Sequence, residues 1–145
     1  MVDLKRQTDL RDAIEGMFFS YRAFTERPDR ILERRGLGRV HHRILYFVGR
    51  NPGVSIKGLL DILDVTKQAL NAPLRQLIEM KLLNVSANAG DRRVRNLDLT
   101  EEGKRLESEL TGAQMRHLEA ALSSAGPDAE AGWRQVMAEL TRPAA

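Results

Sequence analysis

The sequence predicts a mainly α-helical protein that carries one small β-hairpin. Apolar residues recur at spacings of three and four over most of the 145 residues, which is the periodicity of helices with one buried face. Between residues 83 and 99 the spacing changes to two, which is typical of strands, and turn-forming residues interrupt it at 88–93. Helix breakers at 51–53 and 126–127 divide the helical part into segments.

The first predicted helix covers residues 4–27. Pro28 is expected to end it or to lie just past its end, because proline cannot donate a backbone hydrogen bond. A second helix is predicted over residues 38–50, before Asn51-Pro52-Gly53. The apolar stripe of the first helix consists of Leu10, Ile14, Met17, Phe18, Tyr21 and Phe24, and the buried side of the second of Val40, Ile44, Leu45, Phe47 and Val48.

Two shorter helices are predicted next, with a tight connection at Asp64-Val65. Ser55 and Thr66 precede them in the positions of N-caps, where a side-chain oxygen accepts a free backbone N–H. The second of these helices covers residues 67–80. The inward residues are Leu59, Leu60 and Leu63 in the first, and Leu70, Leu74, Leu77 and Ile78 in the second.

The hairpin is followed by two more predicted helices. Thr100 is placed to cap a long helix whose first turn carries Glu101 and Glu102, and Gly126-Pro127 separates it from the last helix. The alternating residues of the hairpin are Leu83, Val85 and Ala87 and, less regularly, Val94, Leu97 and Leu99. The stripes of the two helices are Leu106, Leu110, Ala113, Leu118, Ala121 and Leu122, then Trp133, Val136, Met137 and Leu140.

Composition excludes several classes of protein. With no cysteine, disulfides and thiolate metal sites are impossible. No apolar run approaches the roughly 18 residues that span a bilayer, and the start, Met1 to Arg6, lacks the apolar stretch of a secretory signal. The expected location is therefore the cytoplasm, without membrane contact and without a cofactor.

Charge is distributed unevenly along the chain. Residues 28–98 hold 13 Lys/Arg and 7 Asp/Glu, whereas the remainder of the chain holds 10 Lys/Arg and 13 Asp/Glu. A basic middle favours a polyanionic partner, although a solvated surface of uneven charge would give the same count.

The order helix, short helix, tight turn, helix, hairpin is that of a winged helix-turn-helix, in which the second helix of the turn enters the major groove of double-stranded DNA. Gln and Asn can bond adenine edges, Arg and Lys can bond guanine or phosphate, and hairpin arginines can enter the minor groove. Taken singly, each of these side chains would more often be an ordinary surface residue. The candidate DNA-binding residues are Ser55, Thr66, Lys67, Gln68, Asn71, Arg75, Asp91, Arg92 and Arg93.

These residues resemble the MarR family of transcriptional regulators. The family's wing and the helix after it correspond to Asp91-Arg92-Arg93 and to Leu99-Thr100-Glu101-Glu102-Gly103, and the start of its recognition helix to residues 66–71. The likeness is clearest over residues 54–110 and extends over almost the whole chain. It implies that Asp91 orients the wing arginines by charge pairing.

The chain departs from the family pattern at four positions. Lys81 replaces the usual glycine after the recognition helix, so the helix end there should be strained or of another type. Pro73 lies inside that helix and predicts a kink near residues 69–73. Ala72 and Val85 replace residues that are often polar or basic in the family.

The resemblance implies a single domain over residues 1–145, with a DNA-binding lobe at 37–100 and dimerisation helices at 1–30 and 101–145. A two-fold homodimer would require a near-palindromic operator with half-sites about 34–36 Å apart. The same apolar residues could instead pack within one chain. The candidate interface residues are Leu10, Ile14, Met17, Leu118, Trp133, Val136 and Leu140.

The resemblance also implies a small aromatic or anionic effector that shifts the protein between conformations. His41 and His42 are adjacent and point about 100° apart on a helix, so this spacing does not predict a metal site. The candidate effector residues are Tyr21, Arg22, His41, His42, Arg43 and Tyr46.

The function predicted is a sequence-specific DNA-binding regulator, most simply a repressor. An enzyme is not expected, because the sequence has no phosphate-binding glycine loop and no nucleophile elbow. Two alternatives remain: a winged helix that binds proteins, and a non-specific DNA-binding protein.

Overall fold

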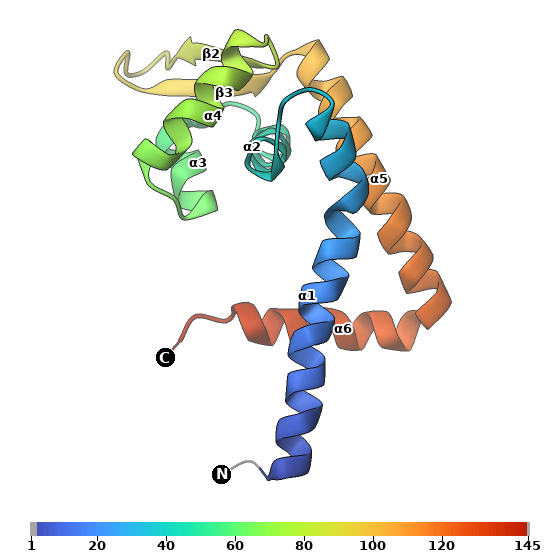
Figure 1. Ribbon diagram of the computed structural model, residues 1–145. Helices are drawn as coiled ribbons and strands as arrows, with labels where there is room; N and C mark the ends of the chain where they lie inside the picture. Colours follow the sequence, from blue (N-terminus) through green and yellow to red (C-terminus); the bar gives the residue numbers. More distant parts are fainter. Residues whose placement is uncertain (1–2, 145) are drawn as a thin grey trace. The chain divides into compact units, whose positions relative to one another are not determined.

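The computed structural model describes residues 3–144. Met1 and Val2, the first residues of the segment considered above for a secretory signal, lie outside the described residues, as does Ala145. Figure 1 shows a mainly helical chain with one small sheet, which confirms the predicted fold class. Its elements are α1 (Leu4–Glu33), α2 (Arg39–Arg50), β1 (Val54–Ser55), α3 (Ile56–Leu63), α4 (Lys67–Glu79), β2 (Leu83–Ala87), β3 (Arg95–Leu99), α5 (Glu101–Ala125) and α6 (Pro127–Thr141).

The chain forms two compact units. One combines the residues up to Phe24 with those from Ala113 onward, and therefore contains most of α1, the second half of α5 and all of α6. The other is Thr25–Gly112 and contains α2, α3, α4 and the sheet. Among residues 3–144, no helix is both long enough and apolar enough to cross a membrane.

The sheet of the second unit is antiparallel, with the strand order β1-β3-β2. The predicted hairpin pairs Leu83 with Leu99 at its base and Ala87 with Arg95 near its tip. Val54 and Ser55 add a third strand beside β3, opposite Leu97 and Asn96. The sequence did not predict this strand, because two residues are too few to show an alternating pattern.

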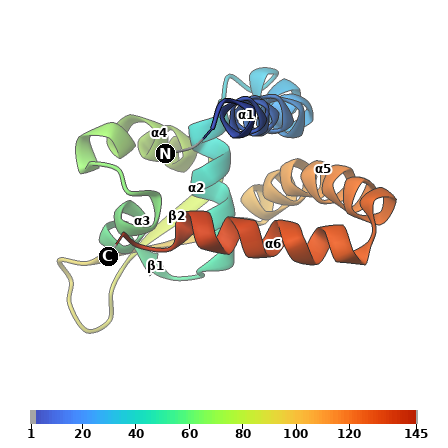
Figure 2. The same ribbon diagram turned by 90° about the horizontal axis from the view of Figure 1, so that it is seen from below.

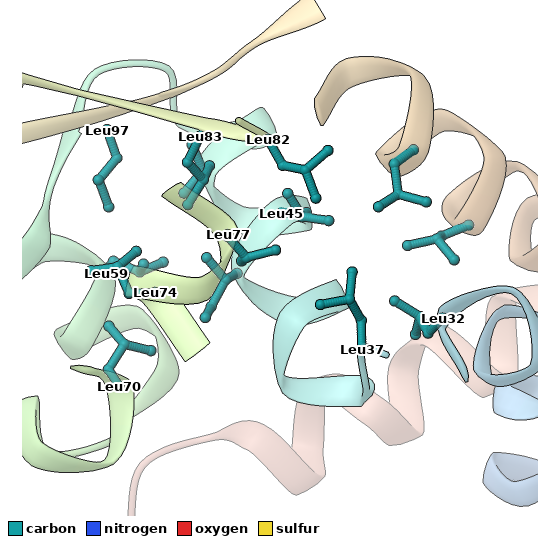
Figure 3. Packing of buried hydrophobic residues seen from close by; sticks show 14 residues of the cluster. Leu32, Leu37, Leu45, Leu59, Leu70, Leu74, Leu77, Leu82, Leu83 and Leu97 are labelled. Carbon is teal, nitrogen blue, oxygen red and sulfur yellow. The ribbon is translucent and has the colours of Figure 1, made fainter. Parts of the chain in front are cut away.

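A leucine-rich core fills the second unit (Figure 3). It receives side chains from the end of α1, from α2, α3, α4, the sheet and the first half of α5, so α4 and the hairpin share one core. Each fully buried leucine contributes about 1.5–3 kcal/mol of transfer free energy. The buried apolar residues are Leu32, Leu37, Ile44, Leu45, Val48, Leu59, Leu70, Leu74, Leu77, Leu82, Leu83, Leu97, Leu106 and Leu110.

The predicted end of the first helix at Pro28 is wrong. The helix α1 continues through Pro28 to Glu33, and both Pro28 and Leu32 are buried. Packing of this last part therefore outweighs the cost of one lost backbone bond. The helix ends instead at Glu33, and Gly36 in the turn that follows has a φ of 70°, which allows the Leu37 N–H to donate to the Leu32 carbonyl at 2.9 Å.

The predicted buried side of α2 is also wrong at one position. Val40 is exposed, and His41 takes its place among the buried residues of the helix. Apolar spacing alone did not reveal this exchange, because the burial of His41 depends on partners from distant parts of the chain.

Candidate nucleic-acid interface

Both predicted caps of the helix-turn-helix are confirmed. The Ser55 hydroxyl accepts the Gly58 N–H at 2.9 Å and begins α3, and the Thr66 hydroxyl accepts the Ala69 N–H at 3.1 Å and begins α4. Between the helices Asp64 adopts a φ of 53°, which makes the connection tight. The Ser55 hydroxyl thus fixes the start of α3, and the Thr66 hydroxyl fixes the start of α4.

The recognition helix α4 presents one polar and one apolar face. Leu70, Leu74 and Leu77 are buried in the core. The candidate DNA-contacting residues Lys67, Gln68, Asn71 and Arg75 are all exposed. The helix therefore offers donors and acceptors to a partner at its N-terminal end, where its dipole also favours an anion.

The tip of the hairpin is ordered by its own side chains. The Asn88 side-chain oxygen accepts the N–H groups of Gly90 at 2.8 Å and Asp91 at 3.1 Å. The Asp91 carboxylate then receives Nε of Arg93 at 3.2 Å and Nη2 at 3.3 Å. These hydrogen bonds hold the pKa of the Asp91 carboxyl below its ordinary value.

The pairing expected of Asp91 is thus present for Arg93. Both Arg92 and Arg93 are exposed on the loop that projects past the strands in Figure 2. Sequence reasoning missed the role of Asn88, although an Asn two residues before Gly is a signal for this kind of turn.

The base of the hairpin is tied to the helices on either side. Lys81 adopts a φ of 61° after the end of α4, as the missing glycine implied. The Thr100 hydroxyl donates to the Lys81 carbonyl at 2.7 Å and accepts the Gly103 N–H at 2.9 Å, which confirms Thr100 as the cap of α5. A Cβ at Gly103 would lie 2.0 Å from the Leu82 carbonyl oxygen, so the close approach of α5 requires glycine.

The candidate effector residues divide between the two units. In the first, the Arg22 guanidinium lies over the rings of Phe18 and Phe19, 5.7 and 5.1 Å from their centroids, and Tyr21 is exposed. The other four, His41, His42, Arg43 and Tyr46, are on α2 in the second unit. Tyr46 packs edge-on against Phe47.

His42 is half-buried. Its Nε2 lies 3.2 Å from the Thr111 hydroxyl oxygen. Burial lowers the pKa of its imidazole below 6.5, while Glu107 and Asp29 act in the opposite direction. The neutral ring is therefore favoured in the folded state.

The first unit carries most of the candidate dimer residues on its surface. Leu10, Ile14 and Met17 on α1 are exposed, and so are Trp133, Val136 and Leu140 on α6. Leu118 on α5 is half-buried. Several large apolar side chains exposed on one unit are typical of a surface that another molecule covers.

Two capped helices joined by a tight turn, with a leucine core shared by a three-stranded wing, define a winged helix-turn-helix. The family model described as MarR family matches residues 35–94. The HTH-type transcriptional regulator PetP of Rhodobacter capsulatus is 48% identical over 135 residues, which cover 93% of this chain and 81% of PetP. The chain belongs to the MarR family and is a DNA-binding transcriptional regulator.

Solved structures show the same fold at lower identity. FabT of Streptococcus pneumoniae, in complex with DNA, matches with a TM-score of 0.81 and 16% identity over 90% of this chain and 94% of that one. NadR in complex with 4-hydroxyphenylacetate matches with a TM-score of 0.73 and 20% identity over 89% of this chain and 92% of that one.

Proposed function

We propose that this protein is a homodimeric repressor that binds a palindromic operator and releases it when a small aromatic or anionic molecule binds. The exposed N-terminal face of α4, flanked by the arginines of an ordered wing, is the observation that carries this proposal. The positive charge of these side chains suits phosphates, and the side-chain amides of Gln68 and Asn71 suit base edges. The FabT complex supports this proposal, because a protein of the same fold is bound to DNA there.

The contact residues proposed fall into two groups. Lys67, Gln68, Asn71 and Arg75 would face the major groove, where Gln68 and Asn71 supply side chains that distinguish bases. Arg92 and Arg93 would lie along the minor groove or the phosphates, with Asp91 fixing Arg93. Ser55 and Thr66 would act mainly by fixing the helix ends.

The exposed apolar residues of the first unit support the dimer. In this proposal residues 1–30 and 101–145 supply the dimerisation helices and residues 37–100 the DNA-binding lobe. The two-fold axis then requires operator half-sites about one helical turn apart.

The effector is proposed on the support of the NadR complex, in which the bound molecule is an aromatic carboxylate. Its candidate contacts are Tyr21 and Arg22 of the first unit and His42, Arg43 and Tyr46 of the second. Both ring nitrogens of the sixth candidate, His41, already have hydrogen-bond partners within the chain. An effector of this kind would act by shifting a conformational equilibrium, so we propose no catalytic role for any residue.

The deciding experiment is selection from a pool of randomised DNA duplexes at physiological salt, followed by sequencing of the retained fraction. We expect an enriched palindrome with half-sites about 34–36 Å apart. Retention without an enriched motif would favour a non-specific DNA-binding protein. Absence of retention would favour a winged helix that binds proteins.

A further inference from the structure

His41 and Gln76 join the recognition helix to the start of α2. The His41 Nε2 lies 2.8 Å from the Gln76 side-chain oxygen, across 35 positions of sequence. The same ring accepts the Gly38 N–H at Nδ1 over 2.9 Å, and the Gln76 amide nitrogen donates to the Gly36 carbonyl at 3.2 Å. We call this set of three hydrogen bonds the His41–Gln76 clamp.

The three bonds together specify the state of the imidazole. Because Nδ1 accepts a backbone N–H, it carries no proton, and Nε2 must therefore carry the proton of the neutral ring. The Nε2–H group then donates to the Gln76 oxygen, and the amide of Gln76 is left to donate to Gly36. The His41 Nε2–H and the Gln76 side-chain amide each meet an acceptor in this arrangement, and His41 is only 9% exposed.

The clamp ties α4 to α2 and to the turn before α2, because Gln76 lies on α4. The leucines of the helix pack into the core with side chains from the other elements, by apolar contacts that are not directional. The bonds of Gln76 are directional and reach the turn after α1 as well as α2. They therefore fix the rotation of α4 about its own axis in a way that apolar packing does not.

We propose that the His41–Gln76 clamp is a positioning device for sequence-specific DNA binding. Contacts to base edges require side chains to be held to within about half an ångström, whereas contacts to phosphates tolerate more movement. Loss of the clamp should therefore weaken specific binding more than non-specific binding. This proposal rests on the proposed function, because it concerns the same recognition helix.

Two variants of one residue separate the two roles of His41. His41→Asn places an amide oxygen near Nδ1, so it can keep the bond from Gly38 but cannot reach Gln76. His41→Gln extends to the position of Nε2, so it can keep the bond to Gln76 but loses the one from Gly38. Both replacements are neutral amides, and each loses one hydrogen bond of the original residue.

The measurement is the affinity of each variant for a duplex enriched by the wild type and for a scrambled duplex, as a function of salt. We expect His41→Asn to lose about tenfold in affinity for the enriched duplex, the equivalent of one directional bond. His41→Gln should stay close to wild type. Binding to the scrambled duplex and the salt slope should be unchanged in both, since no charge is altered.

Equal affinities of all three proteins for the enriched duplex would overturn the clamp, and so would equal losses in the two variants. Thermal unfolding of both variants identifies a loss of fold. If either is unfolded, Gln76→Met replaces it, because the thioether is uncharged, is similar in length, cannot donate to Gly36 and accepts only weakly from His41. The same selective loss of affinity for the enriched duplex is expected of that variant. Wild-type protein that enriches no duplex would instead contradict the proposed function.

Discussion

Lys81 has an unfavourable backbone conformation that hydrogen bonds around it hold in place. Its φ of 61° lies in the left-handed region, which costs a residue with a side chain about 1–2 kcal/mol. The Lys81 N–H donates to Ile78 and the Leu82 N–H to Leu77, which is the usual pattern of a helix that ends in glycine. The bond from Thr100 to the Lys81 carbonyl helps to offset the cost.

Replacement of this residue by glycine should stabilise the fold. We expect Lys81→Gly to raise the free energy of unfolding by about 1 kcal/mol, because glycine adopts this conformation without steric cost. Chemical denaturation at a fixed protein concentration measures the change. Lys81→Ala is the matched control, since it removes the charge and keeps the Cβ; an equal gain in that variant would show that charge, not backbone strain, is responsible.

His42 predicts a dependence of stability on pH. Burial lowers its pKa in the folded state below 6.5, so the unfolded chain binds the proton more readily. The free energy of unfolding should therefore fall as the pH is lowered through 6.5 toward the folded pKa. Comparison of urea denaturation at several pH values in wild type and His42→Gln measures this contribution; identical pH profiles would contradict it.

Side chains on α4 and on the wing should respond differently to substitution. Gln68→Ala should cost about 1–3 kcal/mol at particular operator bases and relax the preference there. Arg93→Ala should weaken binding to all duplexes and reduce the salt slope by about one unit for each lost phosphate contact. Binding titrations over a range of salt on operator variants test both, and a uniform loss for Gln68→Ala would show that it does not contact bases.

At the scale of the element, the recognition helix is unusual because it contains a proline. Pro73 is half-buried within α4, which continues from Lys67 to Glu79. Proline at this position cannot donate to the Ala69 carbonyl. The kink that the sequence predicts near residues 69–73 would turn the N-terminal part of the helix, and it stays a prediction.

Removal of this proline should change both stability and operator preference. We expect Pro73→Ala to stabilise the protein by about 1–2 kcal/mol, because the restored bond exceeds the entropy that proline removes from the unfolded chain. Straightening of the helix should also alter the motif enriched from a random duplex pool. Thermal unfolding and a repeated selection measure the two effects, and a destabilised variant with an unchanged motif would contradict both expectations.

Features that depend on residues close together in the sequence could be predicted. The caps Ser55, Thr66 and Thr100 depend on residues three positions away, so their pattern is visible in the chain itself. The course of α1 past Pro28 and the burial of His41 depend on distant partners. The polar and basic residue types of α4 and the wing could be predicted as candidates for DNA contact. The His41–Gln76 clamp could not be predicted, because its two residues lie 35 positions apart in the sequence.

At the scale of the whole molecule, the basic segment and most of the exposed large apolar side chains belong to different units. The basic residues of 28–98 fall within the unit Thr25–Gly112, which also contains the helix-turn-helix and wing. The exposed apolar side chains of α1 and α6 belong to the other unit. This division favours separate surfaces for DNA and for a second copy of the chain.

A charge on the apolar surface should disrupt the proposed dimer. Val136 is 57% exposed in one chain, so Val136→Glu should leave the fold of the monomer intact while it places an unpaired carboxylate in the interface. We expect light scattering to give about half the wild-type mass, with loss of tight operator binding. Gln135→Glu adds the same charge beside the stripe and should remain dimeric; an unchanged mass for Val136→Glu would place the interface elsewhere.

The junction of Lys81, Thr100 and Gly103 separates the tip of the hairpin from the end of α4. Since both ends of the hairpin are tied together at its base, residues inserted into or deleted from the tip at 88–94 need not disturb the end of α4. The length of the tip can therefore change while α4 keeps its position in the core. Chimaeras that exchange only this tip are expected to change the proposed DNA contacts of the wing without altering those of α4.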